Sequence, residues 1–224
     1  MKADSAAVKP ERPFFAERQP AAFSLLELLV VIAIIAILAT LATAGLDSVS
    51  RSTKLASAAQ RMGDQIALAR QTALARNLPV EVRLYKLPDF DQTSGSPTVW
   101  RGLQVFLVEG ENATPVTRPL FFPNRVIISE NNPVSPLLQN SASGLGAEVT
   151  PTAPVGAFAS ANVRYKSFTI RPNGTVTAGN NVPVGNWFLT IHHENDPKPD
   201  GLKPANFATV QINPVTGKIS VLRP

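Results

Sequence analysis

The chain has 224 residues, enough for one domain of ordinary size together with a membrane segment. It contains no cysteine, which excludes disulfides, thiolate zinc sites, cysteine nucleophiles and lipid anchors on cysteine. The net charge is +5, but the lysines and arginines are scattered along the chain, so this charge does not predict a nucleic-acid partner.

The first predicted element is an apolar helix over residues 23–46. No charged residue lies between Leu28 and Leu46. At a rise of about 1.5 Å per residue, this stretch matches the hydrocarbon thickness of a bilayer. We therefore expect a membrane-inserted helix, with the leading residues 1–22 in the cytoplasm and the long trailing part exported. A cleaved secretory signal is the alternative, because a small-x-small pattern ends at Ala44.

One carboxylate interrupts the beginning of this helix. Glu27 lies one helical turn after Phe23. An unpaired charge within a bilayer costs several kcal/mol, so a carboxylate at this place indicates a function. The other interpretation is that Glu27 lies at the membrane interface, where the cost is small, and its position in the sequence leaves both interpretations open.

The helix is predicted to continue as an amphipathic helix over residues 47–78. Apolar residues recur there at alternating spacings of four and three, which places them on one stripe. The stripe consists of Leu55, Ala59, Met62, Ile66, Ala69 and Ala73. Pro79 ends the helix, Gly63 is a point of expected softening, and the stripe is expected to pack on a following sheet.

Residues 79–224 are predicted to form an exported antiparallel β domain, because short β-rich runs alternate there with Pro, Gly, Asn and Ser. Turns are expected at Gly174 and Gly217. Residues 130–162 are poor in charge and rich in Pro and Ser, and are expected to form a flexible surface loop. The expected strands are 80–85, 99–108, 118–121, 125–129, 167–171, 187–192, 207–212 and 218–222. The predicted fold class is α+β, a long N-terminal helix packed on a C-terminal sheet.

The sequence contains no recognisable catalytic constellation, and we predict no enzyme activity, no cofactor and no metal site. His192 and His193 are adjacent, so on a strand they face opposite sides and cannot easily share one metal. The carboxylates of residues 194–201 have a spacing that could hold calcium, and a solvated hairpin loop is the alternative. Trp100 and Trp187 are interpreted as core residues.

The run AFSLLE at residues 22–27, followed by the apolar helix, resembles the N-terminal signal of type IV pilins and type II secretion pseudopilins. The resemblance implies that a prepilin peptidase cuts between Ala22, where the family usually has Gly, and Phe23, and that it methylates the new N-terminus at Phe23. Glu27 becomes the fifth residue of the mature chain. The resemblance implies that its carboxylate pairs with the Phe23 amine of a neighbouring subunit, which would fix the stagger of packed helices.

Residues 168–174 and 210–221 are similar to strand-turn-strand elements of H-type minor pseudopilins and related minor pilins. The resemblance implies a minor subunit of a type II secretion pseudopilus or a type IV pilus-like filament. Its expected partners are other subunits, the prepilin peptidase, the inner-membrane assembly platform and membrane lipid, with no nucleic acid. Its expected location is the bacterial inner membrane, with the β domain periplasmic, and then the filament. The alternatives are a signal-anchored periplasmic binding or enzymatic domain, and a DNA-uptake or adhesive minor pilin.

Overall fold

The computed structural model describes residues 24–88, 98–123, 125–131, 133–139, 144–178, 187–198 and 203–224, without the side chains of residues 41–47. The chain divides into two compact units, residues 1–46 and 47–224. The described residues form one α-helix, ten strands and two short 3-10 helices.

The predicted long helix is confirmed. Helix α1 runs without a break from Leu25 to Arg76. The next residue is Asn77, whose φ of 54° is the left-handed conformation that commonly follows a helix. Pro79, two residues further on, cannot continue the helical hydrogen bonding, so the chain turns into the first strand.

The strands form one antiparallel sheet in the order β10-β9-β8-β5-β2-β1-β6-β7, with β3 and β4 paired to β2. Their bounds are β1 Val80–Leu87, β2 Val99–Glu109, β3 Asn112–Pro115, β4 Leu120–Phe121, β5 Val126–Ile128, β6 Arg164–Ile170, β7 Val176–Thr177, β8 Phe188–His193, β9 Phe207–Ile212 and β10 Ile219–Leu222. The α+β fold class is therefore confirmed.

Each predicted strand has a counterpart, and apart from 207–212 each differs from the prediction at one end or both. Two of these differences have a visible cause. The strand expected at 118–121 shrinks to β4, because the backbone N–H of Val116 donates to Val105 O (2.8 Å) and bends the chain before it. Strand β6 begins earlier than expected, at Arg164, where Tyr165 exchanges backbone hydrogen bonds with Val149. Strands β3 and β7 were not predicted.

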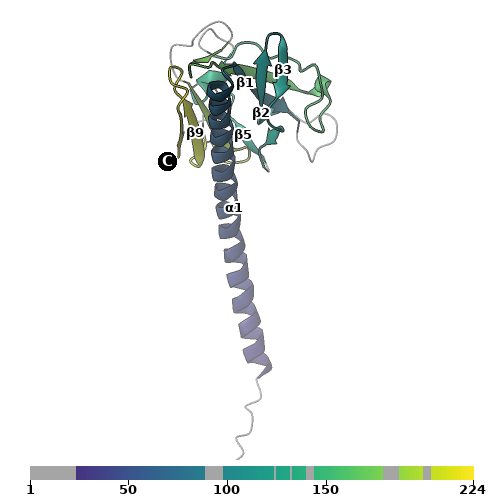
Figure 1. The fold of residues 1–224 in the computed structure, drawn as a ribbon. Helices are drawn as coiled ribbons and strands as arrows, with labels where there is room; N and C mark the ends of the chain where they lie inside the picture. The colour runs from purple at the N-terminus through teal and green to yellow at the C-terminus, as the bar shows by residue number, and fades with distance from the viewer. Residues whose placement is uncertain are drawn as a thin grey trace, which may run out of the picture. The chain divides into compact units, whose positions relative to one another are not determined.

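Residues 55–76 of α1 cover one face of the sheet, with β9 and β5 on either side of the helix (Figure 1). The predicted apolar stripe is confirmed, since all of its members are fully buried. They share one core with the inward-facing residues of the strands. The core also contains Trp100 and Trp187, each 2% exposed, as predicted.

Gly63 has a packing role in place of the expected softening. A Cβ atom at this position would lie 3.0 Å from Cγ2 of Val221, and Gly63 is buried within the continuous helix. The missing side chain therefore allows β10 to lie close against α1.

The two predicted turns are confirmed, and they lie against each other. Gly174 and Gly217 have φ values of 85° and 63°. A Cβ at Gly217 would be 2.6 Å from the carbonyl oxygen of Gly174. Nε of Arg70, on α1, donates to Thr216 O (2.8 Å), which ties the helix to the β9–β10 turn.

The prediction of a flexible surface loop at residues 130–162 is wrong for much of this segment. Five of its apolar residues are buried: Val134, Leu137, Leu138, Leu145 and Val155. Two polar contacts also hold it to the sheet. The Thr190 backbone N–H donates to Ser135 Oγ (2.9 Å), and Lys166 Nζ donates to Leu138 O (2.6 Å). Burial lowers the pKa of Lys166.

The same segment covers part of the second face of the sheet. Its Val155, together with Val163 just after the segment, forms a small second core with Tyr85 and Leu87, and aromatic side chains pack around it. Polar composition predicted exposure for this segment, but its few apolar residues are the ones that find partners on the sheet.

Candidate functional site

The first turn of α1 carries the carboxylate that the sequence singled out. Ser24 is the capping residue, because its Oγ accepts a hydrogen bond from the backbone N–H of Glu27 (3.1 Å). The Glu27 side chain is exposed in the first turn, where a negative charge interacts favourably with the helix dipole. The spacing of Ser24 and Glu27 is that of a capping box.

The residues after Glu27 have an unusual surface. Every large apolar side chain from Leu25 to Leu38 is exposed, with exposed fractions of 42–86%. The next hydroxyl along the chain, on Thr40, donates to Ile37 O (2.7 Å) and so needs no outside acceptor. An apolar surface of this extent is typical of a segment that meets lipid or another apolar helix.

Within the part of the chain that the structure describes, no helix is both long and apolar enough to cross a membrane.

The expected peptidase site, Ala22 and Phe23, lies outside the described residues. Of the residues assigned to processing and assembly, the structure thus describes Glu27 alone. It places this carboxylate at the amino end of the exposed apolar helix, as the sequence predicted.

The two histidines of β8 are buried in different surroundings. Nδ1 of His192 lies 2.9 Å from the carbonyl oxygen of His193, and its Nε2 has no hydrogen-bond partner among the described residues. Burial lowers the pKa of His192. Nδ1 of His193 instead accepts from the Asn195 N–H (3.3 Å) and is 4.0 Å from Asp196 Oδ1.

The loop considered for calcium is only partly described, because residues 199–201 lie outside the described ranges. Its Asp196 is 12% exposed and pairs with Arg51 (3.3 Å), so this carboxylate belongs to an ion pair and not to a solvated turn. Among the described residues, no group of His, Asp and Glu is arranged to hold a metal ion.

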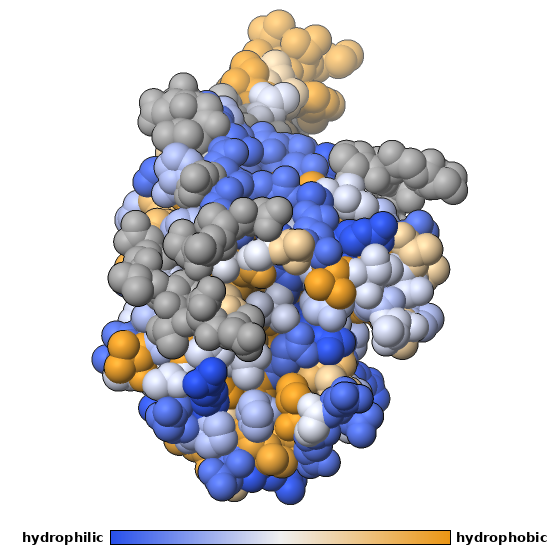
Figure 2. Space-filling view, turned by 90° about the horizontal axis from the view of Figure 1, so that it is seen from above, coloured by the Kyte–Doolittle hydropathy of each residue, from blue (hydrophilic) through white to orange (hydrophobic). Residues whose placement is uncertain are grey.

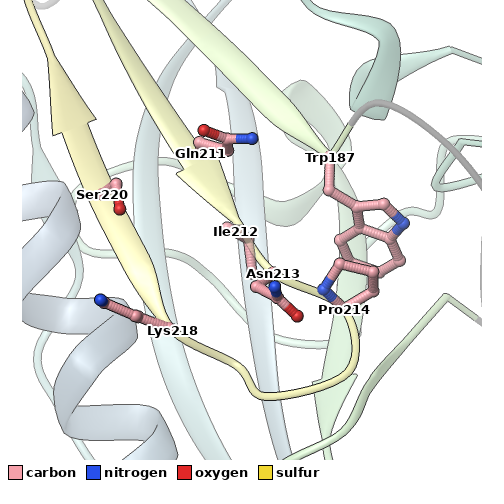
Figure 3. A pocket seen from close by; sticks show the side chains of 7 residues that line it. All are labelled: Trp187, Gln211, Ile212, Asn213, Pro214, Lys218 and Ser220. Atoms are coloured by element: carbon pink, nitrogen blue, oxygen red, sulfur yellow. The ribbon is translucent and has the colours of Figure 1, made fainter.

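A polar hollow that sequence reasoning missed lies beside the β9–β10 turn. Its volume is about 250 Å³. Figure 3 shows Gln211 on β9, Ser220 on β10 and Lys218 just before β10, with Trp187 and Pro214 on the other side. The signal in the sequence is the alternation of polar residues along both strands, which places these side chains on one face of the sheet.

A second hollow, of about 490 Å³, lies between the last turns of α1 and the β2–β3 hairpin, with Ala75, Leu107 and Val116 among its lining residues. On the face of the β domain seen in Figure 2, hydrophilic residues predominate and apolar residues are scattered. This surface contrasts with the apolar surface of residues 25–38.

Comparison with known proteins gives one match to a sequence family. Residues 18–43 match the prokaryotic N-terminal methylation motif. No curated protein has a matching sequence.

Among solved structures, the chain is similar to the type IV minor pilin FimU of Pseudomonas aeruginosa, with 17% identity, 77% of this chain and 93% of that chain covered, and a TM-score of 0.41. It is also similar to the minor pseudopilin EpsH from the Type 2 Secretion System of Vibrio cholerae, with 13% identity, 76% and 98% covered, and a TM-score of 0.40.

The methylation motif lies at the start of a long helix that leads into an antiparallel β domain. Both features agree with the resemblance to type IV pilins and pseudopilins inferred from residues 22–38.

Proposed function

We propose that the protein is a minor pilin or pseudopilin that assembles through α1 into a type II secretion pseudopilus or a type IV pilus-like filament. The observation that carries the proposal is the methylation motif at the start of a helix whose large apolar side chains are exposed from Leu25 to Leu38. Helices with such surfaces are stabilised by packing on one another. The role is structural and involves no catalysis by this chain.

We propose that the precursor is cut between Ala22 and Phe23 and methylated at Phe23. The new amine at Phe23 is positive, and the exposed carboxylate of Glu27 on a neighbouring subunit can pair with it. An ion pair buried among apolar helices adds little stability but disfavours any stagger that leaves a charge unpaired. Glu27 therefore sets the register of the subunits.

The location before assembly is part of the same proposal. Residues 23–46 lie in the bacterial inner membrane, with the leader in the cytoplasm and residues 47–224 in the periplasm. Support comes from the sequence, which has no charged residue between Leu28 and Leu46. Membrane lipid, the assembly platform and the prepilin peptidase are then the partners that act before the filament forms.

The minor character of the subunit is supported by the resemblance of residues 168–174 and 210–221 to minor pseudopilins. The competing proposal is a signal-anchored domain that never enters a filament, and it gives Glu27 no role.

The first experiment expresses the full chain with and without a prepilin peptidase and determines the intact mass and the N-terminal sequence. The expected product is peptidase-dependent and begins at an N-methylated Phe23. An uncut chain, or a product cut near Ala44, would contradict the proposal.

The second experiment compares Glu27→Leu with Glu109→Leu in cells that carry the assembly machinery. Glu109 is an exposed carboxylate at the end of β2 and is the matched control. We expect Glu27→Leu to be cut normally but to be missing from sheared filaments, and Glu109→Leu to behave like the natural chain. Equal incorporation of both variants would favour the anchored domain.

A further inference from the structure

Strand β10 is an open edge of the sheet. In the described sheet it pairs with β9 alone. The Asn213 N–H donates to Lys218 O (2.9 Å), and Ser220 pairs with Gln211 in the register. Since alternate residues of an antiparallel ladder point the same way, the N–H and C=O groups of Ile219 and Val221 face away from β9.

The side chains of this edge differ on its two faces. Ile219 and Val221 are half-buried and pack against the core beneath α1. Ser220 and Leu222 are exposed on the opposite face. The strand itself carries no charge, and an uncharged edge of this kind can pair with another extended chain.

The hollow beside this edge is lined with hydrogen-bond donors. The side chains of Gln211, Lys218 and Ser220 are exposed and make no hydrogen bond or ion pair within the described part of the chain. Oδ1 of Asn213 already accepts from the backbone N–H of Val215 (3.0 Å), which leaves its amide N–H groups as donors. An ammonium group with amide and hydroxyl donors fits a carboxylate.

We propose that the edge of β10 binds an extended acidic segment of a partner protein by strand addition. The partner's backbone pairs with the outward groups of Ile219 and Val221. Because side chains alternate along a strand, its carboxylates fall on the face that carries Lys218 and Ser220.

The positive charges on this edge favour an acidic strand over a second copy of the chain. Lys218 and Arg223 flank β10, and the described residues place no carboxylate in an ion pair with either. A second copy of the chain paired edge to edge would bring these cations together, which is unfavourable. An acidic strand instead gains from them. The inference does not depend on filament formation.

The test measures binding of fluorescent, end-blocked peptides to the full chain in detergent micelles by fluorescence anisotropy. One peptide has the sequence Val-Glu-Val-Glu-Val, and its counterpart has Lys in place of Glu. We expect the Glu peptide to bind and the Lys peptide not to bind. Lys218→Glu should weaken Glu-peptide binding about tenfold and allow the Lys peptide to bind. Lys198→Glu, the same change at an exposed lysine beyond β8, should have no effect.

A second variant tests the proposed backbone hydrogen bonds between β10 and the bound peptide. Ile219→Pro removes an outward N–H while leaving the β9 ladder intact, because that N–H makes no bond to β9. We expect binding about fivefold weaker, the effect of one hydrogen bond. If this variant fails to fold, the two lysine variants still decide the question.

Three results would overturn the proposal. They are no binding of the Glu peptide at millimolar concentration, equal binding of both peptides, and indifference to Lys218→Glu. A fourth such result could come from sedimentation of the chain alone. If the chain forms a dimer that Ile219→Pro abolishes, the occupant of the β10 edge is a second copy of the chain.

Discussion

The contact between α1 and β10 makes an unusual prediction for Gly63→Ala. Alanine in a helix interior is favoured over glycine by about 1 kcal/mol. In this chain the added Cβ would lie 3.0 Å from Cγ2 of Val221, whereas carbon atoms in good contact are about 3.5–4.0 Å apart. Overpacking of a core costs about 1–3 kcal/mol. We therefore expect a net loss of about 1 kcal/mol in the free energy of unfolding.

The assay is urea unfolding followed by tryptophan fluorescence. Trp100 and Trp187 are each 2% exposed, so both report on unfolding of the β domain. A loss of 1 kcal/mol corresponds to about 2–4 °C in Tm for a domain of this size. The decisive comparison repeats Gly63→Ala in a Val221→Ala background. There the crowded methyl group is gone, and the same change should stabilise by about 1 kcal/mol.

The reversal of sign between the two backgrounds is the result that tests the reasoning. If Gly63→Ala stabilises the natural chain, and does so equally in the Val221→Ala background, the close approach of β10 does not constrain this position. The placement of the open edge against α1 would then need another cause.

Three further predictions concern stability and titration. Gly217→Ala should cost about 2–4 kcal/mol, whereas Gly110→Ala should cost about 1 kcal/mol. Both residues have a φ of 63°, but a Cβ meets the Gly174 carbonyl oxygen at 2.6 Å at the first position and nothing within 4 Å at the second; urea unfolding measures both, and equal losses would contradict the steric argument. Burial lowers the pKa of His192 below the ordinary 6.5, so the unfolded chain binds the proton more readily. Stability should be full above pH 6.5 and fall as the pH drops below it, and His192→Leu should flatten Tm over that range. Burial raises the pKa of Tyr85 to about 12, so its tyrosinate absorbance should appear only near that pH, and stability should fall between pH 10 and 12.

The helix and most strands could be predicted because their signals lie in consecutive residues. The stripe from Leu55 to Ala73 has helical spacing, and every member is buried. The turn at Gly217 follows from a residue type that tolerates the left-handed backbone. Packing on the sheet did not have to be known for either prediction.

The predictions that the structure does not bear out concern contacts between distant parts of the chain. Composition predicted that residues 130–162 lie on the surface, yet Leu137 and Leu138 are buried in the core that α1 shares with the sheet. The sequence analysis considered a calcium site or a solvated hairpin loop for the segment that contains Asp196, yet this carboxylate pairs with Arg51. Neither contact has a signal in the neighbouring sequence, because the partners are brought together only when the sheet forms.

The N-terminal methylation motif and the place of Glu27 at the start of an apolar helix can be read from the sequence alone. A short motif and an unbroken apolar run are chemical patterns of adjacent residues, and they can be recognised before the chain folds. Three features depend on the folded domain: β10 is an edge strand, the missing side chain of Gly63 lets β10 lie close against α1, and Lys218 and Gln211 line the same hollow. Strand order and neighbouring faces depend on which packing buries the most apolar surface, and that choice involves the whole domain.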